Sequence, residues 1–428
     1  MRLYNSLSRQ MERLRPRAGQ PVGVYVCGIT PYDTTHLGHA FTYTVFDVLI
    51  RHMETVHGWP VRYVQNLTDV DDDVLLRARN TGEAWQDIVS RWTRRFTDDM
   101  AALRLRPPDH FPGATAYVPQ VLQHVARLVD AGAAYVRDGN VYYRSSLAPD
   151  LGRLADLAAD DLLAVANERG NRPDDPHKEE PLDFVLWQSG QPGEPVWQSP
   201  WGLGRPGWHI ECTAMSWSLL GEQVDVHGGG RDLAFPHHAC EIAQAAPLGG
   251  PRPWVRFWVH VAMVGMDGAK MSKSLGNLVM VSDLLREHEP DTVRLYLLRH
   301  HYRTPWEWDP SRLTECAAWA RTLHAAAARP CGTGVELEPA SFGPRLVAAL
   351  DDDLNTPEAV RVVLDLADAV LDAGAGVRVA AAQDVLRTLA GRVLGLWLRP
   401  YAEVGPAERR AAAWPAPEVA PPLTVLPA

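Results

Sequence analysis

Lysine is scarce in this chain, and two of its lysines lie close together. Lysine occurs only at Lys178, Lys270 and Lys273, and the last two belong to the run Lys270-Met271-Ser272-Lys273-Ser274. The chain otherwise uses arginine for positive charge. A lysine ammonium is a compact point charge on a flexible stem, whereas a guanidinium favours planar two-point contacts. The paired lysines therefore predict phosphate chemistry.

A second motif near the N-terminus points to the same chemistry. His36-Leu37-Gly38-His39 follows a β-prone run, Val22 to Val26, and precedes a long helical pattern. A helix start presents backbone N–H groups and a positive dipole end to an anion, and residues three apart share one helix face. Taken alone, the motif also fits two ordinary histidines at a helix start.

Together, the two motifs resemble the signature of the class I aminoacyl-tRNA synthetases. This resemblance implies a Rossmann-like domain that activates an amino acid with ATP and releases pyrophosphate. Negative charge builds up on the phosphates during that reaction, and fixed positive groups stabilise it. The resemblance gives this role to His36, His39, Lys270 and Lys273.

Four further side chains are candidate metal ligands. Cys27 follows the first predicted strand, Cys212 lies in the run Gly207 to Cys212, and His237 and Glu241 are spaced to share one helix face. Two thiolates, a histidine and a carboxylate suit a four-coordinate zinc ion. Cysteines in a reduced protein are also often inert packing residues, so spacing alone leaves both interpretations open.

The same four positions match the zinc ligands of cysteinyl-tRNA synthetase and its relatives. A soft metal binds a substrate thiolate directly, whereas a serine hydroxyl is a poorer and more basic ligand. The resemblance therefore implies L-cysteine as the substrate and one Zn²⁺ per chain, with ATP and Mg²⁺ as co-substrate. It also implies that Asp232 contacts ribose hydroxyls and that Thr68 lies near the substrate amine. The ATP- or adenylate-binding residues implied by it are Gly28, Ile29, Thr30, Thr42, Asn66, Thr68, Trp208, Gly230, Asp232, Val264, Met271, Ser272 and Ser274.

Trp208 and the acidic run that follows Thr68 each allow another interpretation. Trp208 is equally well read as a core residue, although the resemblance makes it a wall of the cysteine pocket. The acidic run from Asp69 to Asp73 superficially resembles a calcium loop, but it lacks the glycine and the distal glutamate of an EF-hand.

Composition agrees with a large enzyme. The chain has 428 residues, 46% of them hydrophobic, and a formal net charge of −10. This length predicts two or three domains with a sizeable core. The first sixteen residues contain no signal-peptide apolar region, and no run of eighteen apolar residues occurs. We therefore expect a cytoplasmic monomer without a membrane segment.

The resemblance implies an α/β fold, namely a Rossmann-like class I synthetase catalytic domain that carries an inserted connective subdomain and is followed by a C-terminal α-helical bundle. Breaks in the sequence pattern give the boundaries of these parts. The predicted segments are 1–110 and 201–255 for the two catalytic halves, 111–200 for the insertion, 256–310 for the connecting segment with the lysine loop, 311–400 for the helices, and 401–428 for a proline- and alanine-rich tail that we expect to be disordered.

The acceptor of the activated cysteine is the remaining question. Glu168-Arg169-Gly170-Asn171-Arg172-Pro173 resembles the Glu-Arg-Gly-Gly-Asp-Pro segment of the mycothiol-pathway ligase, which joins cysteine to the amine of glucosaminyl-inositol. The run Cys27 to Asp33 is similar to the same family. Full-length cysteinyl-tRNA synthetases continue beyond their helical bundle with a basic anticodon-binding region, and we expect none here. Two features differ from the ligase: Glu241, a zinc ligand that the ligase typically lacks, and Asn171-Arg172 in place of Gly-Asp.

The sequence therefore predicts an ATP-dependent cysteine ligase with glucosaminyl-inositol as acceptor. Cysteine tRNA is the alternative acceptor, although a tRNA ligand favours a basic stripe. A non-catalytic, synthetase-like binding module is the alternative from another class. Pyrophosphate exchange with cysteine separates that module from an enzyme, because a pure binding module shows none.

Overall fold

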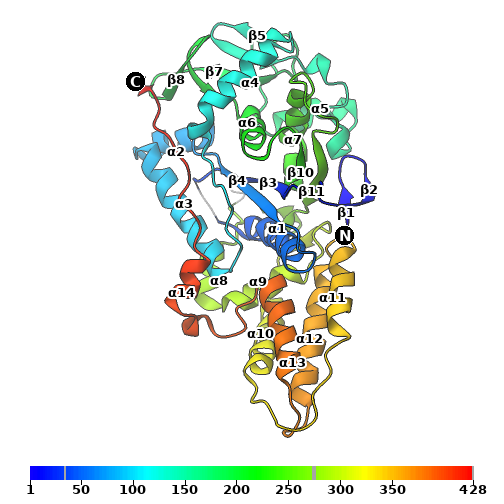
Figure 1. Ribbon diagram of the computed structural model, residues 1–428. Helices are drawn as coiled ribbons and strands as arrows, with labels where there is room; N and C mark the ends of the chain where they lie inside the picture. The colour runs from blue at the N-terminus through cyan, green and yellow to red at the C-terminus, as the bar shows by residue number, and fades with distance from the viewer. Residues whose placement is uncertain (33–34, 272–275, 427–428) are drawn as a thin grey trace.

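A parallel sheet forms the centre of the molecule. The computed structural model describes residues 1–32, 35–271 and 276–426 (Figure 1). The sheet has the order β11-β10-β3-β4, and every neighbouring pair is parallel. Its strands are almost continuously buried, as expected for a sheet covered on both faces. The strands are β3 (Val22–Ile29), β4 (Val61–Leu67), β10 (Val224–Gly230) and β11 (Val255–Val261).

Helices cover the two faces of this sheet. Helix α1 (Leu37–Thr55) packs against β4, β10 and β11, and helix α6 (Trp208–Leu220) packs against β3 and β4. Figure 1 shows α6 above the sheet and α1 below it. Parallel strands bring their carboxyl ends to the same edge, so the segments that follow β3, β4 and β10 meet there.

The chain leaves the catalytic domain after β4 to build a second, antiparallel sheet. This sheet has the order β15-β8-β9-β7-β6-β5, and helix α4 (Val118–Asp130) packs against it. Its strands from the insertion are β5 (Ala134–Arg137), β6 (Asn140–Tyr143), β7 (Phe184–Ser189), β8 (Pro195–Ser199) and β9 (Gly202–Pro206).

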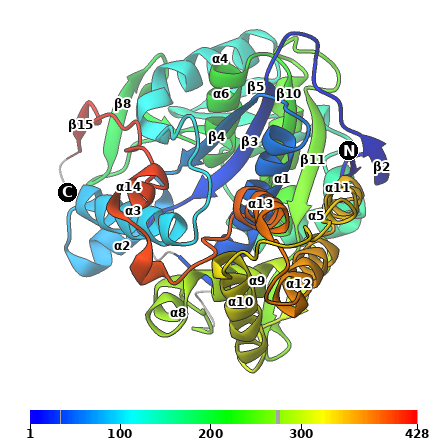
Figure 2. The ribbon, with the colours of Figure 1, turned by 60° about the horizontal axis from the view of Figure 1, so that its bottom comes forward.

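The C-terminal helices form a bundle below the catalytic domain. Helix α9 (Pro290–Leu298) packs against α1 and against the bundle, as Figure 2 shows from below. A buried ion pair joins Asp47 of α1 to Arg294 of α9. Burial by itself raises the pKa of Asp47, but the Arg294 and Arg51 guanidinium groups bring it below its ordinary value. The bundle contains α10 (Arg312–Ala328), α11 (Phe342–Asp351), α12 (Thr356–Asp372), α13 (Ala380–Leu386) and a π-helical continuation over Arg387–Val393.

The segment after Pro400 differs from the sequence-based expectation of a disordered tail. It contains α14 (Pro406–Ala411) and β15 (Thr424–Val425), and it crosses α2 (Asp72–Thr81) and α3 (Trp85–Ala102) to reach β8 (Figure 1). The Trp414 ring packs edge-on against Phe96 and Phe111, with ring centroids 5.2 and 5.6 Å apart. Composition predicts disorder because proline and alanine bury little surface, whereas one tryptophan and a short strand pairing supply the anchorage.

The remaining α-helices and β-strands connect these parts of the fold. They are β1 (Arg2–Asn5), β2 (Gln10–Arg13), α2 (Asp72–Thr81), α3 (Trp85–Ala102), α5 (Ala159–Asn167), α7 (His237–Ala245), β12 (Val264–Met266), β13 (Ala269–Lys270), α8 (Val281–Glu287) and β14 (Trp306–Glu307). None of the helices in the described part of the chain combines the length and the apolar character needed to span a bilayer.

Candidate functional site

The carboxyl ends of β3 and β4 are held in close contact by a glycine. The Gly28 N–H donates to Asn66 Oδ1 at 2.8 Å, and Asn66 Nδ2 donates to Thr68 Oγ1 at 3.3 Å. A Cβ atom at Gly28 would lie 1.6 Å from the Asn66 carbonyl oxygen, so a larger residue does not fit. The structure thus brings three predicted adenylate-binding residues together at one edge of the sheet.

The histidine motif begins α1 at the same edge. His36 is the N-cap residue, and its Nδ1 accepts from the Gly38 N–H at 3.1 Å. The His36 and His39 rings are stacked, with centroids 3.7 Å apart. Thr42 lies one turn further along, where its hydroxyl donates to the Gly38 carbonyl at 3.1 Å. Both imidazoles therefore lie at the positive end of a long helix, where negative charge is stabilised.

The segments that flank the lysine loop are anchored beside this helix start. Leu37 N–H donates to the Val279 carbonyl at 2.8 Å, and Val281 N–H donates to the Thr35 carbonyl at 2.9 Å. On the other flank, Met271 N–H donates to the Val264 carbonyl at 3.1 Å, and both side chains are buried. Residues distant in sequence are thus brought together around the predicted phosphate-binding loop.

Some residues of that loop are not described. Ser272, Lys273 and Ser274 lie outside the described residues. Lys270 is described through its backbone, which pairs with Gly265 in the β12–β13 hairpin. The roles of Lys270 and Lys273 stay predictions.

The four predicted metal ligands converge behind the sheet edge. They come from β3, α6 and α7, and one ligand atom from each lies within 4.8 Å of the others. The sulfur atoms of Cys27 and Cys212 lie 3.8 Å apart, and His237 Nε2 lies 3.4 Å from Glu241 Oε1. All four side chains are buried.

This geometry fits a tetrahedral metal ion. Two thiolates at zinc–sulfur distances of about 2.3 Å in a tetrahedral site lie about 3.8 Å apart, whereas a disulfide would need about 2.05 Å. Within the described structure, Glu241 Oε1 is buried without a hydrogen-bond partner. Such an orphaned carboxylate oxygen beside two thiols is the donor set that a cation satisfies.

Burial favours the neutral forms of Cys27, His237 and Glu241. It raises the pKa of the Cys27 thiol and of the Glu241 carboxyl well above their ordinary values, and it lowers the pKa of His237. A bound cation reverses this preference for the thiol and the carboxyl, because coordination favours their ionised forms.

Two neighbouring histidines were not predicted from the sequence. His227 and His238 form an alternative set of possible ligands with Cys27 and Glu241. His227 Nε2 lies 3.0 Å from Glu241 Oε2, and His238 is also engaged by His260, whose Nε2 lies 2.8 Å from His238 Nδ1. These contacts suit groups that orient the ligands from behind. The adjacent pair His237-His238 was the available sequence signal, but spacing alone does not show which ring faces the thiols.

Trp208 lies between this cluster and open space. Its ring stacks on His237, with centroids 4.3 Å apart and an interplanar angle of 18°. His209 Nδ1 contacts His237 Nδ1 at 3.0 Å from the other side, and burial lowers the pKa of His209 to about 4. Trp208 and His209 therefore hold the His237 ring in place.

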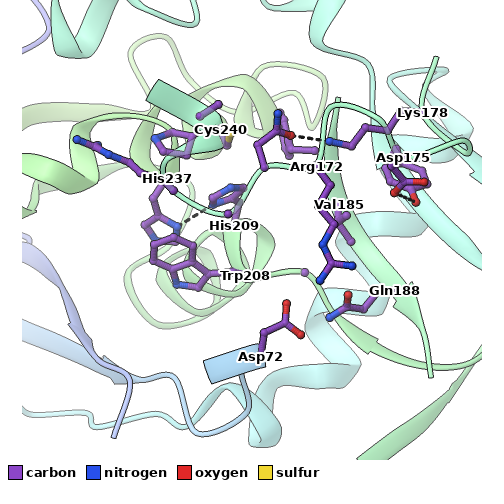
Figure 3. Close-up of a pocket in the computed structure, with 18 of the residues that line it drawn as sticks. Asp72, Arg172, Asp175, Lys178, Val185, Gln188, Trp208, His209, His237 and Cys240 are labelled. Carbon is purple, nitrogen blue, oxygen red and sulfur yellow. Dashed lines mark hydrogen bonds between the residues drawn. The ribbon is translucent and has the colours of Figure 1, made fainter. Parts of the chain in front are cut away.

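A cavity of about 1510 Å³ opens in front of Trp208. Its lining includes the predicted residues Thr30, Asp232 and His237, the acidic turn at the start of α2, and the segment from Glu168 to Lys178. Figure 3 shows Trp208, His209, His237 and Cys240 on one side, Arg172, Asp175, Lys178 and Gln188 on the other, and Asp72 at the lower edge. The cavity thus connects the metal-ligand cluster with the insertion.

Side-chain hydrogen bonds within the insertion help to hold the segment from Glu168 to Lys178. Asn171 Oδ1 accepts from Lys178 Nζ at 2.5 Å, and Asn171 Nδ2 donates to Asn167 Oδ1 at 2.7 Å and to the Pro181 carbonyl at 3.1 Å. The Asn171 amide therefore holds its own loop. The next residue, Arg172, is exposed at the cavity wall.

Comparisons with known proteins agree with this arrangement. The family model for the catalytic domain of tRNA synthetases class I (C) matches residues 13–318, and a DALR domain matches residues 345–399. The catalytic-domain match covers more than half of the chain. The chain belongs to the class I tRNA synthetases. The predicted family and fold class are therefore confirmed.

Two kinds of relative match the chain almost equally well. An L-cysteine:1D-myo-inositol 2-amino-2-deoxy-alpha-D-glucopyranoside ligase of Thermomonospora curvata is 45% identical over 90% of this chain and 92% of its own length. A cysteine–tRNA ligase of Alkalilimnicola ehrlichii is 43% identical over 92% of this chain and 85% of its own length.

A solved structure gives the same fold at lower identity. The Mycobacterium tuberculosis methionyl-tRNA synthetase in complex with methionyl-adenylate is 17% identical, with a TM-score of 0.64 over 96% of this chain and 99% of that one. The similarity includes the helical bundle of this chain as well as its catalytic domain.

Proposed function

We propose that this protein is an ATP-dependent ligase that activates L-cysteine as cysteinyl-adenylate and transfers it to the amine of glucosaminyl-inositol, with release of AMP and pyrophosphate. The observation that carries the proposal is the cavity lined both by His237 of the four-residue cluster and by the insertion segment Glu168–Lys178. Several relatives that are 44–46% identical to this chain bear the name of this ligase.

Activation takes place at the edge of the parallel sheet. We assign Gly28 the role of letting the nucleotide approach the backbone, and Asp232 the role of accepting from a ribose hydroxyl. His36 and His39 at the α1 N-terminus would stabilise negative charge on the phosphates, and we assign the same role to Lys270 and Lys273. Magnesium accompanies ATP as part of the substrate.

Cysteine is selected at the four-ligand cluster. We propose zinc as the ion held by Cys27, Cys212, His237 and Glu241. Zinc supplies a soft Lewis acid for the substrate thiolate, which serine matches poorly. Trp208 covers the His237 ring and excludes water from the cluster, while His227 and His238 orient its ligands from behind.

Transfer to an amine forms an amide bond. The amine nitrogen attacks the carbonyl carbon of the mixed anhydride, and the carbon–oxygen bond to AMP breaks. Polar side chains in the insertion segment, among them the exposed Arg172, are available to hydroxyl groups of an amino sugar in the same cavity.

Cysteine tRNA remains the second candidate acceptor, because relatives named cysteine–tRNA ligase are 41–43% identical to this chain. An acceptor competition separates the two. Purified protein with ATP and labelled cysteine is offered glucosaminyl-inositol in one reaction and deacylated cysteine tRNA in another. We expect label in the sugar amide alone; label in tRNA alone contradicts the proposal.

A further inference from the structure

The acidic turn at the start of α2 lies at the cavity where the second half-reaction would occur. Asp71, Asp72 and Asp73 follow β4 within six residues of its last residue, Leu67, and all three line the cavity with Thr30 and Trp208. An amine attacks only when it is unprotonated, so transfer to an amino sugar requires a group that removes its proton.

Four of the eight carboxylates that line the cavity have a cationic or hydroxyl partner. Asp72 and Glu194 both form ion pairs with Arg205, a side chain that is only 4% exposed. Asp73 accepts from the Tyr32 hydroxyl at 2.5 Å, and Asp175 accepts from the Tyr142 hydroxyl at 2.8 Å. Such partners stabilise the ionised form and weaken a carboxylate as a base.

Asp71 differs from these carboxylates. Its Oδ1 caps α2 by accepting from the Asp73 N–H at 2.9 Å, and its Oδ2 makes no hydrogen bond to any other described residue. The pKa of Asp71 is raised to about 6, chiefly by burial and also by the nearby Asp73 and Asp72 carboxylates, while the Asp73 N–H and Arg205 oppose the shift. A carboxylate with this pKa is ionised at neutral pH yet accepts a proton more readily than an ordinary aspartate.

We propose that the α2 turn and Arg172 form the two walls of the acceptor subsite, and that Asp71 is the base that takes the proton from the attacking amine. The amine nitrogen forms the amide bond, AMP leaves with the electrons of the broken carbon–oxygen bond, and the amine proton moves to Asp71 Oδ2 and then to water. Arg172 contacts acceptor hydroxyls from the opposite wall. This inference rests on the proposed amino-sugar acceptor.

The test uses Asp71→Asn in the full-length protein. Asparagine caps a helix about as well as aspartate, so α2 keeps its cap while the base is lost. Three quantities are measured between about pH 5 and pH 8: pyrophosphate exchange with cysteine, single-turnover transfer of cysteine to glucosaminyl-inositol, and transfer to hydroxylamine, which is unprotonated at neutral pH and needs no base. Asp98→Asn, which removes an exposed carboxylate from α3, is the matched control.

We expect Asp71→Asn to lower transfer to the amino sugar roughly 100-fold or more, the usual size of a general-base contribution. Pyrophosphate exchange, transfer to hydroxylamine and the melting temperature should match those of Asp98→Asn. Both proteins should lose transfer at low pH as the acceptor amine becomes protonated. The wild type should show an additional decline as the pH falls through about 6, because Asp71 becomes protonated, and the variant should lack this additional decline.

Two negative results have different meanings. If wild-type protein transfers cysteine to the amino sugar and Asp71→Asn does so at the same rate with the same pH profile, Asp71 is not the base. Equal losses for the amino sugar and hydroxylamine also overturn the inference, because Asp71 would then serve a step that both share. If the wild type itself transfers no cysteine to the amino sugar, the proposed function fails, and the inference fails with it.

Discussion

The two sides of the cavity differ in how firmly the fold holds them. The metal-cluster side reaches the cavity at His237, and behind it the other three predicted ligands are buried on a central strand and two helices. The insertion side, residues 168–178, is a loop held by side-chain hydrogen bonds of Asn171 with Lys178 and of Arg169 with the carbonyls of Asp232 and Phe235. A site that distinguishes sulfur from oxygen needs fixed ligands, whereas a site for a polar acceptor tolerates a more adaptable wall. This comparison predicts that substitutions on the two sides affect different half-reactions.

The largest effect is expected for Cys212→Ala. Loss of one ligand should remove the bound metal and lower cysteine-dependent pyrophosphate exchange by more than the ~10–100-fold that a lost outer-sphere partner costs. Metal content by mass spectrometry and the exchange rate are measured together. Cys316→Ala, which removes a buried thiol from the helical bundle, should retain both. Full metal content and exchange in Cys212→Ala would show that Cys212 is not a required metal ligand.

A smaller effect, on the stability of the fold, is expected for a substitution at Gly28. Gly28→Ala places a Cβ atom against the Asn66 backbone, so the free energy of unfolding should fall by about 3 kcal/mol. Gly170 in the insertion has φ +92°, but a Cβ atom there would meet open space, so Gly170→Ala should cost only about 1–2 kcal/mol of backbone strain. Chemical denaturation measures both. Equal losses would contradict the contrast between the two sides.

The smallest effect is expected for Arg172→Ala. Because Arg172 is exposed, loss of its contact to the acceptor should raise the KM for glucosaminyl-inositol roughly 10-fold, the lower end for a hydrogen bond to a charged group. Pyrophosphate exchange with cysteine should not change. Arg137→Ala, on the same subdomain but outside the cavity lining, is the control. A loss of exchange in Arg172→Ala would place this residue in the activation step instead.

The order of these effects follows from where each residue lies. Buried ligands on regular elements have no alternative geometry, so removing one abolishes the site. An exposed loop side chain contributes one contact among several, and water replaces part of it.

Residue types and short-range spacing in the sequence were enough to predict many residues of the candidate site. His36 and His39 stand at a helix start, and His237 and Glu241 share a face of α7, because both features depend only on local helical geometry. The family and the α/β class also followed from such motifs. Their assigned roles as ligands and phosphate-binding groups stay predictions.

Other features could not be predicted from the sequence, because they depend on contacts between distant parts of the chain. His227 lies on a buried strand with no motif around it, and its contact with Glu241 exists only because β10 and α7 pack together. Asp71 belongs to an acidic run. Its solvent access and its hydrogen-bond partners decide its chemistry, and the sequence shows neither of them. The order in the tail depends on Trp414 reaching Phe96 and Phe111, contacts that composition does not encode.

The sequence by itself determined which chemical groups this protein possesses and which of them share a helix or a turn, because those relations are fixed by the local geometry of the backbone. Tertiary structure alone decided that the sulfur atoms of Cys27 and Cys212, 185 residues apart, lie 3.8 Å from each other, and that the insertion lines the same cavity as His237. Those distances result from the packing of the parallel sheet, its helices and the inserted subdomain as a whole, and no local pattern in the chain contains them.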